Sequence, residues 1–248
     1  MKSKALSCAL LCIFILFNAC KESDDESKNP SPSPRLKQLT HYWGDSILLQ
    51  LSYEYDQAWR LIKQTNSDGW SYQYTYAPGM VIEKKNYPNG SGVDTLLLNE
   101  KGFEISRSRG YLTTAYDQEG FIVKKIRHTF EPTAYFFTKE NGNIVQVTEM
   151  DGDSYHHICN VQTMEYLPNS TNTIGPENMG MSFYGKQDPN LVSVFSYKAY
   201  GFANSPNPDE IMISVNKTYE YELDNQQRVI KKMTVGNPND YYMHTYYD

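Results

Sequence analysis

The feature that most constrains how this chain folds is a short pattern that recurs along most of its length. Each copy has a run of alternating aromatic or aliphatic residues, a polar turn, and a second run in which apolar and basic residues alternate. The copies are Tyr53–Thr65, Tyr72–Asn86, Asp94–Ser108, Thr113–Arg127, Tyr135–Met150 and Tyr219–Met233, of which Tyr72–Asn86 is the loosest. Alternation with a period of two places one set of side chains against a core and the other in water, so each copy predicts a β-hairpin.

The turns of these hairpins share a rule that some copies break. The first turn position holds Asp56, Asn99, Asp117, Lys139 and Asp224, and the fourth holds Trp59, Gly102, Gly120, Gly142 and Gln227. Asp or Asn at the first position bonds the backbone two residues on, and Gly at the fourth adopts a positive φ, which closes a type I turn with a bulge. The turns with Trp59 and Gln227 are therefore expected either to be built differently or to carry strain of roughly 1 kcal/mol.

The spacing of the copies predicts how the hairpins assemble. They follow one another with a period of about 21 residues, and a unit of this size cannot bury its apolar face alone, so neighbours must stack. We therefore expect an all-β fold, an antiparallel hairpin meander that forms either a strongly twisted open sheet or a partly closed barrel. The regular repeats occupy residues 40–150 of a single domain that spans 36–248.

The rest of this domain is less regular. Residues 151–218 include a loop near Pro168 and a stretch, 176–190, in which we expect a short helix. A second loop, 204–210, precedes an expected strand over Ile211–Val215, and the final hairpins occupy 219–248. The last residues, Tyr241–Tyr247, read as a closing strand that covers an edge of the sheet.

The N-terminus has the zones of an export signal. Lys2 and Lys4 precede an apolar run, residues 6–17, that is shorter than the roughly 20 residues needed to span a bilayer. The following Phe17-Asn18-Ala19-Cys20 resembles a bacterial lipobox, although Phe17 stands where leucine is usual. The resemblance implies that residues 1–19 are a lipoprotein signal peptide and that Cys20 carries the lipid by which the protein contacts a membrane. The alternative is an ordinary secretory signal with a cysteine nearby.

Residues 20–35 are expected to form a tether. An acidic run, Lys21–Glu26, is followed by alternating Ser and Pro in 27–34, a composition that buries little apolar surface. The acidic run resembles the export signal that sends Bacteroidota lipoproteins to the cell surface. This implies an outer-membrane lipoprotein exposed on the cell surface. A plain linker, with the domain facing the periplasm, is the alternative.

Composition excludes some classes of protein. The formal net charge is -6 and no basic cluster is present, so no nucleic-acid partner is expected. After signal removal and lipidation of Cys20, only Cys159 remains, and it is expected to be a small buried residue and not a nucleophile. The 21 Tyr and 10 Phe favour strands over helices.

Two of the copies carry a resemblance to known proteins. YEYDQAWRLIK (Tyr53–Lys63) and YEYELDNQQRVIKK (Tyr219–Lys232) resemble the Tyr-Asp (YD) hairpin repeats of Rhs-type proteins. Over residues 36–248 the chain is similar to a Bacteroidota lipoprotein family of unknown function built on such hairpins. The more specific parts are MSFYGKQDPNLV (Met181–Val192) and the NSPNPDEI loop. The resemblance implies an all-β fold and a cell-envelope setting, and it brings no catalytic residues.

Few residues indicate chemistry. Asp151, Asp153 and His156 are weak metal candidates, because Asp and His at close spacing bind zinc or calcium. His156 and His157 are adjacent, however, and point to opposite faces if they lie on a strand, so a polar loop is the favoured interpretation. No nucleophile elbow or phosphate-binding glycine loop is present. We therefore expect no cofactor and no enzyme, although a hydrolase with a scattered active site is left open.

The aromatic residues are the best functional candidates. Trp43, Trp59 and Trp70 are the candidate ligand-binding residues, because exposed Trp stacks on sugar rings or anchors a protein partner. The alternative is that these rings fill a thin core. The leading hypothesis is a non-enzymatic envelope module that binds a glycan or an envelope protein, and a structural partner of an outer-membrane complex is the second. Ser46 and Thr95 also lie in three-residue patterns typical of O-glycosylation in exported Bacteroidota proteins.

Overall fold

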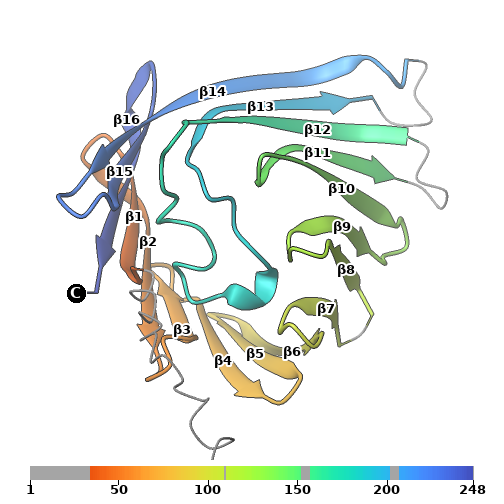
Figure 1. The fold of residues 1–248 in the computed structure, drawn as a ribbon, viewed down its shortest axis with the longest axis vertical. Helices are drawn as coiled ribbons and strands as arrows, with labels where there is room; N and C mark the ends of the chain where they lie inside the picture. The colour runs from red at the N-terminus through yellow and green to blue at the C-terminus, as the bar shows by residue number, and fades with distance from the viewer. Residues whose placement is uncertain (1–33, 109, 152–156, 202–206, 248) are drawn as a thin grey trace, which may run out of the picture. The chain divides into compact units, whose positions relative to one another are not determined.

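The computed structural model describes residues 34–108, 110–151, 157–201 and 207–247, which form a closed β-barrel (Figure 1). Each strand pairs antiparallel with the next along the chain, and β1 pairs with β16 to complete the ring. Cys20, the expected signal peptide (1–19) and residues 20–33 of the expected tether lie outside the described residues. The described residues contain no helix with the length and hydrophobicity of a transmembrane segment.

The barrel has sixteen strands. They are β1 (Leu36–Trp43), β2 (Ser46–Tyr55), β3 (Leu61–Asn66), β4 (Ser71–Ala77), β5 (Met80–Tyr87), β6 (Gly90–Leu98), β7 (Glu104–Arg107), β8 (Leu112–Tyr116), β9 (Ile122–Arg127), β10 (Thr133–Glu140), β11 (Asn143–Asp151), β12 (His157–Tyr166), β13 (Val192–Tyr200), β14 (Ile211–Leu223), β15 (Val229–Thr234) and β16 (Asn237–Tyr246).

The predicted antiparallel hairpin meander is confirmed, and of the two architectures left open the structure has the barrel. The expected closing strand lies in β16 and pairs with β1, for example through His244 opposite Leu39. Tyr42 and Tyr241 stack across this junction, with ring centroids 4.9 Å apart. An open sheet is therefore wrong for this chain, because the junction leaves no free edge.

The turn chemistry expected from the sequence is also present. Asp56 Oδ1 accepts hydrogen bonds from the backbone N–H groups of Ala58 and Arg60, both at 2.9 Å. Asn99 and Asp224 cap their turns in the same way, and Asp117 Oδ1 accepts hydrogen bonds from the N–H groups of Gly120 and Phe121. The copy with Lys139 differs, because its chain reverses at Asn141 and Gly142, which have φ values of 51° and 81°. Such a pair at positive φ is the usual two-residue hairpin loop.

Trp59 and Gln227 carry the strain that the sequence allowed. Their φ values are 58° and 62°, in the left-handed region that disfavours side chains. Both backbone N–H groups still close the turn, since Trp59 N donates to Asp56 O and Gln227 N donates to Asp224 O. The two turns therefore keep the common geometry at a local cost.

The strain at Gln227 predicts a stabilising substitution. Gln227 is exposed, so Gln227→Gly removes the strain with little loss of packing and is expected to raise the free energy of unfolding by about 1 kcal/mol. Gly102→Ala is the control at the equivalent position, where φ is 81° and an added Cβ meets no atom within 4 Å. We expect it to destabilise by a similar amount in urea denaturation. Changes of the same sign in both variants would contradict the assignment of strain.

The connection between β12 and β13, residues 167–191, runs into the barrel and is called the inner segment (Figure 1). It contains a single 3₁₀ turn, η1 (Ser182–Tyr184), within the range where a short helix was expected. Phe183 of this turn is 2% exposed and packs in one cluster with Tyr53, Tyr74 and Leu96 of the wall. The core of the molecule is therefore built between the wall and the inner segment.

The inner segment is bonded to one end of the barrel, which is called the plugged end. The bonds reach the first strand and several strand-connecting turns. They are Leu36 N to Asn178 O, Leu61 N to Gly180 O, Lys186 N to Gly120 O, Asn190 N to Asn143 Oδ1, and Val229 N to Thr173 Oγ1. Leu36, Leu61 and Val229 are fully buried there. The opposite end, where β1 ends and β2 begins, is called the far end.

Alternation along the strands separates an inner wall from an outer wall. Tyr53 turns inward to Phe183, whereas its neighbour Glu54 turns outward and forms an exposed ion pair with Lys63 at 2.9 Å. On the inner wall, beyond the inner segment, side chains such as Tyr197 and Asn160 are only half-buried and bond to each other at 2.6 Å. A barrel of this size has room for a hydrated interior.

Candidate functional site: the inner wall and the rim

Charged side chains from β5, β6 and β7 form an ionic cluster on the inner wall. Arg107 Nε donates to Glu104 at 2.6 Å, and its terminal nitrogens donate to Glu83 at 3.2 Å and to the Tyr184 hydroxyl at 3.1 Å. Lys85 extends the cluster to Asp94 at 2.8 Å and contacts Glu83 at 3.1 Å. Tyr184 belongs to η1, so the cluster joins the wall to the inner segment.

The ionic cluster has a structural role, because both of its glutamates are buried and bonded to Arg107. Glu104 is 1% exposed and Glu83 is 3% exposed. Burial acts to lower the pKa of Arg107, but the hydrogen bond to Glu104 and the surrounding negative charges outweigh it and raise that pKa. Arg107 therefore stays charged and holds both carboxylates. Converging carboxylates that serve acid–base catalysis must instead reach a substrate.

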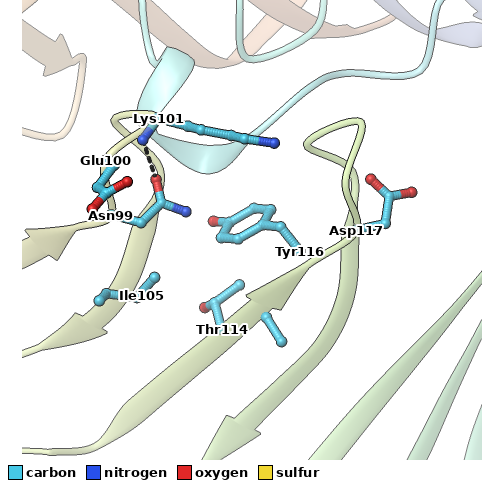
Figure 2. Close-up of a pocket in the computed structure, with 8 residues that line it drawn as sticks. Asn99, Glu100, Lys101, Ile105, Thr114, Tyr116 and Asp117 are labelled. Atoms are coloured by element: carbon cyan, nitrogen blue, oxygen red, sulfur yellow. Dashed lines mark hydrogen bonds between the residues drawn. The ribbon is translucent and has the colours of Figure 1, made fainter.

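A cleft of about 500 Å³ opens in the wall between β7 and β8 (Figure 2). In the described residues these strands pair at one position, Ser106 with Thr113, and the cleft lies towards the turn that precedes β7 and the turn that follows β8. The lining residues are Asn99, Glu100, Lys101, Ile105, Thr114, Ala115, Tyr116 and Asp117. Lys101 Nζ donates to Gln118 O at 2.7 Å and thereby joins the two turns beside the cleft.

Most polar groups of the cleft already bond within the wall. The Tyr116 hydroxyl donates to Glu104 O at 2.9 Å, and burial raises the pKa of Tyr116. Asp117 caps its own turn and accepts a hydrogen bond from Lys139 at 2.7 Å. The cleft therefore offers few free hydrogen-bonding groups and is a weaker candidate than the ends of the barrel.

The far end carries a rim of exposed aromatic and aliphatic side chains. The rim is defined as Trp43, Ile47, Leu48, Trp70, Tyr111, Phe130, Ile211, Met212 and Ile213, all of them in turns or strand ends away from the inner segment. Trp43 is 52% exposed and Trp70 is 42% exposed. The rings of Trp70 and Tyr87 meet edge to face, with centroids 4.8 Å apart. These residues share one end of the barrel but come from turns and strand ends around the ring, and we treat them as the candidate interaction surface.

The structure places the three tryptophans singled out from the sequence at opposite ends of the barrel. Trp43 and Trp70 lie on the rim, but Trp59 lies at the plugged end. There its ring contacts Tyr55 and Tyr247, with centroids 6.1 and 6.3 Å away, and its carbonyl accepts a hydrogen bond from Arg35. The three therefore do not form one binding surface.

The weak metal candidates fall largely outside what the structure describes. Asp153 and His156 belong to residues 152–156, which are not described. Asp151 contacts His157 at 3.2 Å, and the other His157 nitrogen lies 3.3 Å from Pro208 O. In the described ranges no group of three or more His, Cys, Asp or Glu residues is placed to hold a metal ion.

The structure also describes the surroundings of the remaining residues named from the sequence, which are Cys159, Ser46 and Thr95. Cys159 Sγ donates to Glu149 O at 3.3 Å, and burial raises the pKa of the thiol to about 11. A thiol with a raised pKa is a poor nucleophile. Ser46 is exposed at the start of β2, whereas Thr95 is half-buried on β6.

Comparison with known proteins gives the fold. No family model matches the chain, and no curated protein matches it. A porin-like protein from Bacteroides uniformis is similar in structure, with 14% identity and a TM-score of 0.58 over 87% of this chain and 99% of that one. The N-terminal domain of the effector protein SpvB from Salmonella typhimurium is 10% identical over 86% of this chain and 88% of that one. Its TM-score of 0.28 is too low to carry an argument.

Sequence reasoning missed the ionic cluster. Glu83 lies at an inward position of β5, two residues after the buried Val81, and Glu104 of β7 pairs with Leu98 of β6, which packs against the core. A charged residue at a core position of an alternating strand was the available signal. This signal did not lead to a prediction, because the contact with the balancing cation, Arg107, follows only from the pairing register of the strands.

Proposed function

We propose that this chain is a lipid-anchored, non-enzymatic binding protein of the bacterial cell envelope. It belongs with the Bacteroidota lipoproteins built on YD-like hairpins, is held on the outer membrane through Cys20, and is exposed on the cell surface. Its rim binds a glycan or an envelope protein. The observation that carries the proposal is that the rim and the point where the chain enters the barrel lie at opposite ends.

The entry point is fixed to the inner segment. Asn178 Nδ2 donates to Pro34 O at 3.1 Å, and Arg35 donates to Glu177 O at 2.7 Å. A lipid on Cys20 thus attaches the barrel through its plugged end. Trp43, Trp70 and the other rim residues are then left accessible to a partner in the surroundings. The resemblance of the acidic run to a surface-export signal supports the same arrangement.

The outer wall supports attachment by a tether. It carries exposed ion pairs, Glu54 with Lys63 and Glu222 with Lys231, and Lys124 lies on it above the Phe136 ring. Lipid-facing positions of a membrane-inserted barrel form a continuous apolar band. We therefore propose that the outer wall faces water and that the lipid on Cys20 is the membrane attachment.

The test is binding by intact cells that carry the full chain. Cells with the wild-type protein are incubated with immobilised glycans and with labelled envelope proteins, and the Trp43→Ala/Trp70→Ala double variant is compared. Truncation of aromatic hot spots of this kind costs about 2 kcal/mol or more, so we expect binding to weaken at least about 30-fold. Trp59→Ala at the plugged end is the matched control and is expected to bind like wild type.

Two outcomes would overturn the proposal. One is equal loss of binding in the Trp59→Ala control, which would mean that the rim has no special role. The other is binding that survives protease treatment of intact cells although the protein is digested once the envelope is opened, which would place the domain in the periplasm.

A second candidate function is supported by the aliphatic part of the rim. Ile211, Met212 and Ile213 are consecutive and exposed, which suits a protein partner better than a sugar. In this case the barrel is a structural partner of an outer-membrane complex. Co-purification of one protein at a constant ratio, lost on Ile211→Ser/Ile213→Ser, would favour this function over glycan binding.

A further inference from the structure

Strands β14, β15 and β16 place basic side chains together on the inner wall, across the barrel from the ionic cluster. Lys232 Nζ lies 3.8 Å from the centroid of the Tyr219 ring. Lys232 pairs with Tyr221 of β14 and with Tyr242 of β16, so Lys217, Lys232 and His244 occupy positions that face the same side of the sheet. We call Lys217, Lys232 and His244 the basic patch.

The basic patch differs from the ionic cluster in having no balancing carboxylate. Lys85 and Arg107 each bond to two acidic side chains. In the part of the chain that the structure describes, neither Lys217 nor Lys232 forms an ion pair, although buried charges in proteins are normally paired. Burial lowers the pKa of Lys232 to about 8, and the neighbouring Lys217 lowers it as well.

The acidic group beside the basic patch is already engaged. Asp240 acts on Tyr219 and Tyr242, but its carboxylate lies 2.7 Å from His41 Nε2 and 3.5 Å from the Thr234 hydroxyl. His41 in turn stacks on Tyr242, with centroids 4.2 Å apart. Asp240 is therefore held on the β1–β16 side and is not the partner of Lys232.

His244 gives a second, independent indication. It is 4% exposed, and its Nδ1 is the buried side-chain nitrogen that lacks a hydrogen-bond partner in the described structure. A buried polar atom left without a partner costs about 1–3 kcal/mol and calls for an explanation. Burial and the positive Lys232 hold its pKa at about 4, so the ring is neutral near pH 7 and has an N–H to donate.

We propose that the basic patch is an oxyanion site, which binds a carboxylate, sulfate or phosphate group carried by the ligand. The ammonium groups of Lys232 and Lys217 supply the charge, and His244 Nδ1 is the polar atom beside them that has no partner in the described residues. The ring of Tyr221, which lies opposite Lys232 on the neighbouring strand, suits a sugar ring attached to that group. This inference rests on the proposed binding function and assigns its ligand as an acidic saccharide.

Inorganic sulfate is the first probe, measured by thermal unfolding of the full chain at constant ionic strength set with NaCl. Sulfate stabilises proteins in general, so the comparison is between variants. We expect sulfate to raise the Tm of wild type by about 2–4 °C more than that of Lys232→Met. Lys231→Met, on the outer wall of the same strand, is the matched control and keeps the full shift. Lys217→Met is the second variant, and we expect it also to lose the additional rise in Tm that sulfate gives to wild type.

Calorimetric titration with glucuronate and with glucose then tests the saccharide. Binding of glucuronate to wild type, at least tenfold weaker in Lys232→Met, with no binding of glucose, is the expected result. Equal sulfate shifts in wild type, Lys232→Met and Lys217→Met would overturn the oxyanion site. Sulfate binding without glucuronate binding would overturn the saccharide. The Trp43→Ala/Trp70→Ala variant is expected to keep the sulfate shift, so failure of the rim proposal is distinguishable from failure of this one.

Discussion

Replacement of Arg107 by alanine is expected to lower the free energy of unfolding by about 3–5 kcal/mol, the usual cost of removing one partner from a buried ion pair. The change leaves Glu83 and Glu104 buried without the cation that bonds to both of them. It also removes the hydrogen bond to Tyr184, so the inner segment loses one of its links to the wall. Urea denaturation at neutral pH, followed by fluorescence of the tryptophans, measures the loss.

Two controls separate burial from charge. Lys63→Ala removes the exposed outer-wall pair with Glu54 and is expected to cost less than about 1 kcal/mol. The triple change Arg107→Met, Glu83→Gln and Glu104→Gln removes the buried charges together and is expected to recover most of the stability. A cost for Arg107→Ala that matches Lys63→Ala would contradict a structural role of the ionic cluster.

Gly180→Ala is expected to destabilise the barrel by about 2–5 kcal/mol, the sum of a left-handed backbone and an overpacked contact. Gly180 has a φ of 69°, and an added Cβ would lie 2.8 Å from Leu61 N and 3.1 Å from Trp59 O. These are backbone atoms of the plugged end, which a side-chain rotation does not relieve. Leu61 N also donates a hydrogen bond to Gly180 O. We therefore expect the substitution to disturb the contact between the inner segment and the wall.

The matched control is Gly44→Ala in the turn between β1 and β2. Its φ is 57°, but the added Cβ meets no atom within 4 Å, so only the backbone strain of about 1–2 kcal/mol is expected. Limited proteolysis gives a second readout, because a displaced inner segment is expected to be cut faster in Gly180→Ala than in Gly44→Ala. Equal stability and equal cleavage in the two variants would show that the inner segment is not seated at Gly180.

The sequence contained the information for single hairpins but not for the complete ring. Alternation and the Asp or Asn turn caps are local, so residues such as Asp56 and Asp224 indicated their turns directly. β12 and β13 were not predicted from the sequence, because the long inner segment separates them and no short turn links them. Closure of the barrel depends on the pairing of β1 with β16, whose partners are remote in the chain.

The candidate sites also differ in whether they depend on residue type alone or on the pairing of remote strands. Trp43, Trp59 and Trp70 were named as candidates from residue type, which does not say at which end of the barrel each one lies. Trp59 was grouped with the other two although successive hairpin turns alternate between the two ends of a barrel, which places it at the other end. The basic patch stayed hidden, since Lys217, Lys232 and His244 meet only through the register of three strands.

The junction of β1 and β16 sets the order in which this protein can mature. Local hairpins form as soon as their residues are available, but the ring closes only after the last strand has been delivered, and such long-range pairing is slow. Until then the chain presents two unpaired edges, one at β1 and one at the most recently formed strand. These edges are templates for intermolecular pairing. The chain is therefore most vulnerable to aggregation just before the ring is complete, and loss of β16 alone would leave the edge of β1 unpaired.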